Sequence, residues 1–228
     1  MKDELILNYK VPPEDIYVVY NGVDLDKFHP RNKGLFYKEI RDKYNISLNE
    51  FLILFVGSGF RRKGLIYLLK AVGILKDKPL KLLVVGRGRI GPYVRIIKKL
   101  NIENKVIFTG SIKNEINKIY TASDIFILPS IYESFGNVCL EAMASGIPVI
   151  VSRNCGASEI ITHKENGLII NNPKNSYEVS EAIKFLLSHK DIREKISIEA
   201  RKTAENYTIE KNISEIIEIF NKVKNRSN

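Results

Sequence analysis

Two glutamates, Glu133 and Glu141, lie eight positions apart within the segment 129–151, which reads PSIYESFGNVCLEAMASGIPVIV. An apolar run of strand length precedes the loop that carries Glu133. A helix-like run begins after Gly136, and Gly146 stands where a helix C-terminal glycine belongs. The segment therefore predicts a strand, a loop, a helix carrying Glu141 and a second strand, which together make one βαβ unit.

The spacing of the two glutamates suggests what they could bind. Between them, residues 134–138 would supply the free N–H groups of a helix N-terminus, which attracts anions such as a diphosphate. Each carboxylate would accept hydroxyl hydrogen bonds at one end of the ligand, worth about 1.5–3 kcal/mol each. A nucleotide sugar has this layout. The alternative is that Glu133 is a surface carboxylate of a loop and Glu141 a solvated helix residue.

Strands and helices alternate along the rest of the chain. Strands are predicted at 51–56, 81–85, 105–108, 124–128, 149–152 and 168–170. A further strand is predicted at 16–20, after a helical tail and linker over 1–15. We expect an α/β fold over 16–228, including the C-terminal helices: a Rossmann-like, doubly wound parallel sheet with helices on both faces. Because ligands bind at the carboxyl ends of such strands, the loops 57–64 and 130–136 should face one crevice.

Two glycine-rich loops follow predicted strands. The loop 57–64 places Arg61, Arg62 and Lys63 just before a helix N-terminus, where fixed cations beside free N–H groups suit a diphosphate. For a lone R-R-K-G sequence, the alternative is a solvated basic turn.

The second glycine-rich loop, residues 86–91, reads GRGRIG and matches the G-x-G-x-x-G pattern of an NAD-type dehydrogenase. That class needs an Asp or Glu about 20 residues later, at the end of the next strand. The next strand ends at Phe108-Thr109-Gly110 without an acid, and Pro92 disturbs the expected phosphate loop. We therefore disfavour a dinucleotide site.

Three motifs together resemble one protein family. The E-x7-E spacing with AMASGIPVI behind it resembles retaining glycosyltransferases of family 4, which have the GT-B fold. Residues 18–30, VVYNGVD-x3-F-x-P, resemble the entry to the C-terminal domain of these enzymes, and Lys63-Gly64 resembles the end of their G-x(n)-K-G loop. The resemblance runs from about residue 16 almost to the end of the chain. It implies the C-terminal, nucleotide-sugar-binding half of a GT-B enzyme.

The resemblance also implies residue roles. Glu133 would act in catalysis by orienting the transferred sugar, while Lys63 and Arg62 would meet the negative charge that develops on the leaving diphosphate. Glu141 would accept hydrogen bonds from the two ribose hydroxyls. The residues implicated in substrate binding are Gly57, Ser58, Arg61, Arg62, Lys63, Ser111, Ile112, Glu133, Ser134, Phe135, Gly136, Asn137, Val138 and Glu141. The backbone near Ser111 and Ile112, after the predicted strand 105–108, is expected to lie beside the nucleotide base.

Protein cations are expected to neutralise the phosphates, so no metal or other cofactor is expected. Many family members carry an arginine directly after the first glycine of the loop, where this chain has Ser58. Either Arg61 or Arg62 would supply that charge instead. The chain has an Asp24-Leu-Asp26 sequence, but it follows an Asn-Gly turn at the entrance of the domain rather than a strand end.

Composition limits the compartment and the partners. The chain has 228 residues, a formal charge of +10 and 44% hydrophobic residues, without an apolar run of membrane-spanning length. We expect a cytoplasmic protein, with a peripheral place on the inner face of the membrane left open, and no nucleic-acid partner because no such motif is present. The excess of Lys and Arg over Asp and Glu is predicted to be spread over the helices. Cys139 and Cys155 read as reduced and structural.

Two functions from different classes stay open. In the first, the chain belongs to an active hexosyltransferase that acts on a glycan or glycolipid acceptor, with the N-terminal GT-B domain on a separate chain. In the second, it is a nucleotide-sugar-binding module or subunit without transferase activity of its own. A sugar-nucleotide epimerase or phosphorylase is a weaker alternative. The last helix carries an apolar stripe over 209–223, whose exposure would signal a missing interface.

Overall fold

The computed structural model describes residues 2–112 and 114–226, which build a six-stranded parallel sheet. The strands are β1 (Phe51–Val56), β2 (Leu80–Val85), β3 (Val106–Gly110), β4 (Ile125–Leu128), β5 (Val149–Ser152) and β6 (Leu168–Ile170). Their order is β3-β2-β1-β4-β5-β6, so the chain reverses its direction of winding between β1 and β4. This is the predicted doubly wound sheet, and its switch point lies where such sheets bind ligands.

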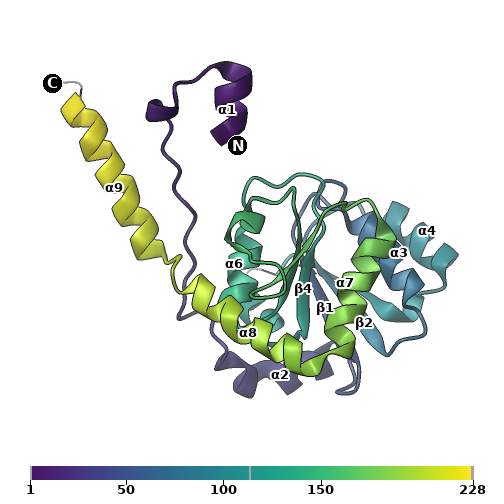
Figure 1. The fold of residues 1–228 in the computed structure, drawn as a ribbon. Coiled ribbons are helices and arrows are strands. Elements are labelled where there is room, and N and C mark those ends of the chain that lie inside the picture. The colour runs from purple at the N-terminus through teal and green to yellow at the C-terminus, as the bar shows by residue number, and fades with distance from the viewer. Residues whose placement is uncertain (1, 113, 227–228) are drawn as a thin grey trace.

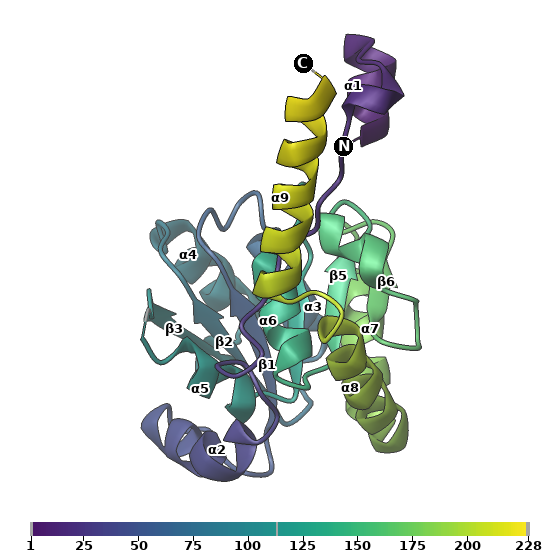
Figure 2. The ribbon, with the colours of Figure 1, turned by 90° about the vertical axis from the view of Figure 1, so that its left-hand side faces the viewer.

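Helices cover both faces of the sheet (Figures 1 and 2). On one face, α3 (Leu65–Ile74) packs against α4 (Gly91–Leu100) and α7 (Ser176–Ser188). On the other side of the sheet lies α6 (Asn137–Ala144), which packs against α8 (Lys190–Ala204). A further pair is formed by α2 (Asn32–Lys43) and α5 (Ile116–Ala122). Among the described residues, three short 3₁₀ turns complete the secondary structure: η1 (Pro13–Asp15), η2 (Glu103–Lys105) and η3 (Gly156–Ile160).

The central strands form the core. Residues 52–55 of β1 and 125–128 of β4 are fully buried, and their sequences are continuously apolar. Parallel strands covered on both faces require such runs, because neither face meets water. This requirement explains why the strand positions could be read from the sequence.

The first and last helices extend beyond the sheet and its covering helices. Helix α1 (Lys2–Tyr9) has no buried residue, and α9 (Ile209–Arg226) projects away from the sheet beside the segment that follows η1 (Figures 1 and 2). The predicted strand at 16–20 does not form, and that prediction is wrong. The segment runs beside α9 instead, where the Asn212 amide donates to the Tyr20 carbonyl at 2.7 Å. A helix offers no free ladder groups, so the segment finds no strand to pair with.

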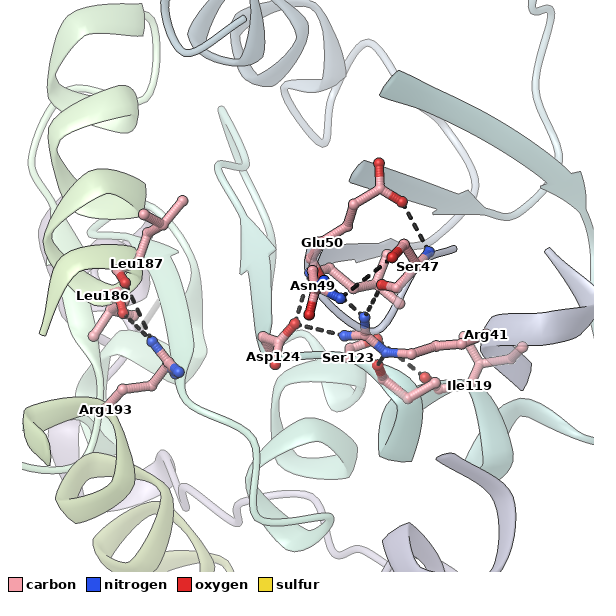
Figure 3. Close-up of polar contacts among 12 residues, drawn as sticks. Arg41, Ser47, Asn49, Glu50, Ile119, Ser123, Asp124, Leu186, Leu187 and Arg193 are labelled. Atoms are coloured by element: carbon pink, nitrogen blue, oxygen red, sulfur yellow. Dashed lines mark hydrogen bonds and ion pairs between the residues drawn. The ribbon is translucent and has the colours of Figure 1, made fainter. Parts of the chain in front are cut away.

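A buried ion pair ties together the amino-terminal edge of the sheet (Figure 3). Arg41 of α2 is fully buried and its Nη2 lies 2.7 Å from Asp124 Oδ2, just before β4. The same guanidinium donates to the carbonyls of Ala122, Ser47 and Glu50 at 3.1, 2.9 and 2.8 Å. This edge lies opposite the carboxyl ends of the strands, so its ion pair serves the fold and not a ligand.

Candidate functional site

Two loops meet at the carboxyl edge of the sheet beside the switch point. The first, residues 57–64, follows β1, and the second follows β4. They approach so closely that a Cβ on Gly64, whose φ is +75°, would lie 1.9 Å from the Pro129 carbonyl oxygen. Ile131 N also donates to the Arg62 carbonyl at 2.8 Å. Glycine at position 64 is therefore required for the contact, and the predicted meeting of the two loops is seen.

The contact brings three of the predicted side chains together. Lys63 Nζ lies 2.7 Å from Glu133 Oε2, and both side chains are about nine-tenths buried. Arg62 Nη1 lies 3.1 Å from the same carboxylate oxygen and donates to the Tyr132 carbonyl at 2.9 Å. A Cβ on Gly57 would lie 2.5 Å from the Lys63 side chain, so Gly57 leaves room for the lysine to reach Glu133. The result is a carboxylate held between two cations.

The pair has unused hydrogen-bonding capacity. An ammonium group has three donors, and Lys63 Nζ makes one hydrogen bond among the residues that the structure describes. Arg62 is about half exposed. A second anion can therefore join the cluster from solvent, and the two cations would offset its charge.

The loop that carries Glu133 is held in place by the residues after β5. Glu133 N donates to the Asn154 carbonyl at 3.1 Å, and Gly156 N donates back to the Glu133 carbonyl at 3.0 Å. A Cβ on Gly156 would lie 2.0 Å from the Ser134 carbonyl oxygen, so this position also needs glycine. This support was not predicted from the sequence. The available signal was the Asn-Cys-Gly sequence at 154–156, one residue after the predicted strand 149–152.

The N-terminus of α6 follows this loop directly. Its N-cap residue, Gly136, has a φ of +92° and provides no capping side chain. Ser134 and Asn137 are exposed and Phe135 and Val138 are half-buried. An N-terminus without a side-chain cap carries the partial positive charge that favours a phosphate.

Glu141 lies on the second turn of α6 and has a partner that the sequence did not reveal. The hydroxyl of Tyr120, which is fully buried on α5, donates to Glu141 Oε2 at 2.8 Å. Burial raises the pKa of Glu141, while the Tyr120 hydrogen bond and the charge of Lys27 act in the opposite direction. Glu141 is thus a half-buried carboxyl with one oxygen fixed in position, as a hydroxyl-binding group requires.

The remaining predicted residues do not join the Lys63–Glu133 cluster. The Arg61 side chain is exposed and makes no hydrogen bond or ion pair within the described chain. Ser58 Oγ accepts from Arg87 N at 3.3 Å. Exposed Ser111 and half-buried Ile112 follow β3, which is an edge strand separated from β1 by β2. Of the three adjacent cations, Lys63 and Arg62 contact Glu133 and Arg61 does not.

The structure also bears on metals, cysteines and membranes. Within residues 2–112 and 114–226, no three His, Cys, Asp or Glu side chains are grouped as metal ligands. Cys139 and Cys155 are buried and unbridged, and Cys155 Sγ donates to the Phe135 carbonyl at 3.1 Å. In the same part of the chain, every helix is too short or too polar to cross a bilayer.

Comparison with known proteins identifies glycosyltransferases that are similar to this chain. An uncharacterised glycosyltransferase of Methanocaldococcus jannaschii is 33% identical over 227 residues, which cover 96% of this chain and 57% of that protein. The crystal structure of a glycosyltransferase from Rickettsia africae superposes with a TM-score of 0.88 at 28% identity, over 97% of this chain and 61% of that one. Anabaena HepE, crystallised with UDP-glucose, superposes with a TM-score of 0.82 at 24% identity, over 92% of this chain and 58% of that one, which shows the fold alone.

The chain thus spans somewhat more than half of the relatives it matches. The family model of glycosyl transferases group 1 matches residues 36–203, a range that contains both loops, the Lys63–Glu133 pair and Glu141. The chain belongs to the family of group 1 glycosyltransferases.

Proposed function

We propose that this chain is the donor-binding, C-terminal half of a retaining, family 4 glycosyltransferase with the GT-B fold. The observation that carries the proposal is the buried Lys63–Glu133 pair, which has spare donors and lies beside the N-terminus of α6. Both features stand at the switch point of a doubly wound sheet, where ligands of such sheets bind. A nucleotide-diphosphate sugar matches the chemistry of this edge.

The proposed roles follow from the position of each group. The diphosphate lies against Lys63 Nζ, Arg62 and the N-terminus of α6, which together stabilise the charge that develops as it leaves the sugar. Glu133, between the two cations, is near the sugar and accepts hydrogen bonds from its hydroxyls. Glu141, one helical turn further from the cluster, accepts hydrogen bonds from the ribose hydroxyls. The base lies toward Ser111 and Ile112.

For the donor and the acceptor, we propose a chemical class. We propose a hexosyl donor, and UDP-glucose is the first candidate because Anabaena HepE, a protein of the same fold, was crystallised with it. The proposed acceptor is a glycan or glycolipid. No metal ion is required in this scheme, since Lys63 and Arg62 supply the charge that a metal would otherwise supply.

The acceptor site is proposed to lie on a second, N-terminal domain, from a separate chain or from another part of a longer protein. The apolar stripe of α9 supports this idea because it is exposed: 50% at Ile213, 53% at Ile217 and 70% at Phe220. Helix α9 projects on the same side as α1, away from the sheet (Figure 2). An exposed stripe of this kind is typical of an interface that lacks its partner.

The second candidate is a nucleotide-sugar-binding module or subunit without transferase activity of its own. Transfer of labelled sugar, measured with and without an added N-terminal domain, separates the two candidates. An enzyme half should become active with the added domain, whereas a binding module should stay inactive.

The first experiment is calorimetric titration of the chain with UDP, GDP and ADP, and then with their glucose and mannose forms, without added metal. We expect one nucleotide to bind, and Lys63→Ala to weaken its binding by at least about tenfold. Lys76→Ala is the matched control, because Lys76 is exposed and follows α3 at the opposite edge of the sheet. Binding that survives Lys63→Ala unchanged would contradict the proposed site.

A further inference from the structure

Beside the loop 57–64, a pocket separate from the Lys63–Glu133 cluster lies between the N-terminal ends of α3 and α4. Its volume is about 980 Å³. Neither Lys63 nor Glu133 lines it, whereas Arg62 lines it and also contacts Glu133. We call it the α3–α4 pocket. It is therefore a neighbour of the proposed donor site and has its own walls.

The floor of the α3–α4 pocket is aromatic. Phe60 is 3% exposed and packs edge-on against Tyr93 at a centroid distance of 5.7 Å. Tyr67 and Ile96, both half-buried, extend the apolar surface. A Cβ on Gly88 would lie 2.5 Å from the Phe60 ring, so glycine there lets the second glycine-rich loop lie against the floor. This packing gives the G-x-G-x-x-G sequence a structural role that requires no dinucleotide.

The rim of the pocket is cationic. Arg61, Arg89 and Lys174 line it together with Arg62, and no acidic side chain of the described residues does. The side chains of Arg61, Arg89 and Lys174 make no hydrogen bond or ion pair with the described residues. Unpaired cations around an apolar floor are suited to a ligand that carries an anionic group on an apolar body.

The charge of the surrounding segment has the same sign. Residues 51–102, from β1 to just beyond α4, contain twelve Lys and Arg and a single acidic residue, Asp77. The prediction that the positive charge is spread over the helices is therefore wrong. The charge is concentrated in the half of the sheet that holds the α3–α4 pocket, and such a field attracts anionic surfaces.

We propose that the α3–α4 pocket binds an anionic phospholipid of a bilayer. Arg89, Lys174 and Arg61 hold the headgroup phosphate, and the first part of an acyl chain lies against the half-buried side chains of Tyr67 and Ile96. Phosphate alone would leave the apolar surface of Tyr67 and Ile96 uncovered, and a neutral apolar ligand would leave the cations without a counter-charge. Because Arg62 lies between this pocket and Glu133, the bound lipid would hold the carboxyl edge of the sheet at the membrane surface.

The test is sedimentation of the chain with vesicles of phosphatidylcholine alone or with about 30% phosphatidylglycerol. We expect binding to the anionic vesicles only. The double variant Arg89→Ser/Lys174→Ser should bind roughly tenfold more weakly, because each basic side chain near an anionic surface contributes to attraction. The matched control is Lys76→Ser/Lys78→Ser, which removes the same charge from the exposed turn between α3 and β2. Its binding should stay within about twofold of the unchanged chain.

Three outcomes would overturn the proposal. Equal losses in the two double variants would indicate a generally basic surface without a lipid site. Binding unchanged in Tyr67→Ser would show that no chain enters the pocket, since loss of this apolar contact should weaken binding about threefold. Displacement of the vesicles by glycerol phosphate or a short RNA at the same phosphate concentration would identify a simple anion site. Thermal unfolding of each variant, followed by circular dichroism, verifies that it is folded.

Discussion

Two buried ion pairs stand at opposite edges of the sheet, and they differ in how completely their hydrogen bonds are used. At the amino-terminal edge, Arg41 donates to Asp124 and to three backbone carbonyls. Asp124 Oδ2 also accepts from Leu52 N at 2.7 Å. At the carboxyl edge, Lys63 donates to Glu133 alone within the described part of the chain. The first pair is nearly saturated, with four of the five guanidinium N–H groups in use, whereas the second is open to another partner.

The difference indicates what each pair does. The Arg41–Asp124 pair fixes α2, the turn before β1 and the start of β4 relative to one another, and it has little hydrogen-bonding capacity left for a ligand. An unsaturated pair stabilises the fold less, because desolvation of its charges is offset less completely. It can complete its hydrogen bonds when an anionic ligand arrives. Mutation of the Arg41–Asp124 pair should therefore lower mainly the stability, whereas mutation of the Lys63–Glu133 pair should weaken mainly ligand binding.

The largest expected effect is on stability, from Arg41→Met. Removing one partner of a buried ion pair leaves an uncompensated charge, so the free energy of unfolding should fall by about 3–5 kcal/mol, as measured in urea. Arg31→Met is the control, because the Arg31–Asp26 pair is exposed, with side-chain exposures of 59% and 95%. That variant should lose less than about 1 kcal/mol. Equal losses would mean that saturation of the Arg41 pair has no energetic role.

The next effect is on binding, from Lys63→Met. Loss of a charged hydrogen bond to the diphosphate should weaken nucleotide binding by roughly 10- to 100-fold in calorimetry. The free energy of unfolding should fall by less than half of the Arg41→Met loss, since Arg62 still faces Glu133 at 3.1 Å. A variant that unfolds as readily as Arg41→Met would show that both edges are structural, which would contradict the comparison.

The three adjacent cations show what the sequence could and could not predict. The strand positions and the meeting of the two loops follow from continuous apolar runs and from the rule that strand ends share an edge. Nothing in the R-R-K sequence tells which side chain turns inward. The structure selects Lys63, because Gly57 leaves space for it, and leaves Arg61 on the rim of another pocket. The direction of a side chain in a loop depends on such long-range contacts.

Two other features were equally inaccessible to the sequence. The contact between Tyr120 and Glu141 joins helices that are separated by a strand, and no local pattern encodes it. The segment 16–20 is predicted as a strand because its residues favour extended backbone, but in the structure it pairs with no strand. Extended conformation is encoded locally, whereas a place in a sheet depends on where a free edge lies.

A comparison of the two glutamates tests their division of labour within the carboxyl edge. Glu133→Ala should weaken a nucleotide sugar about tenfold but the bare nucleotide diphosphate only slightly, because the carboxylate would contact the sugar. Glu141→Ala should weaken both ligands by a similar factor, since the ribose is common to them. Titration of each variant with UDP and UDP-glucose gives the four affinities. Equal profiles for the two variants would contradict the assigned roles.

The smallest expected effect is the pH dependence of stability that comes from Glu141. Burial raises its pKa in the folded chain, so the folded state holds the proton more tightly than the unfolded state does. The stability contributed by this carboxyl is present below its unfolded pKa and is lost as the pH rises through its folded pKa. Urea unfolding between about pH 4 and pH 7 should show this loss, and Glu141→Gln should lack it. Tyr120→Phe should move the loss to higher pH, because the Tyr120 hydrogen bond holds the Glu141 pKa down. A shift in the opposite direction would show that the hydroxyl favours the protonated carboxyl, and Glu141 would then be a poor acceptor for ribose at neutral pH.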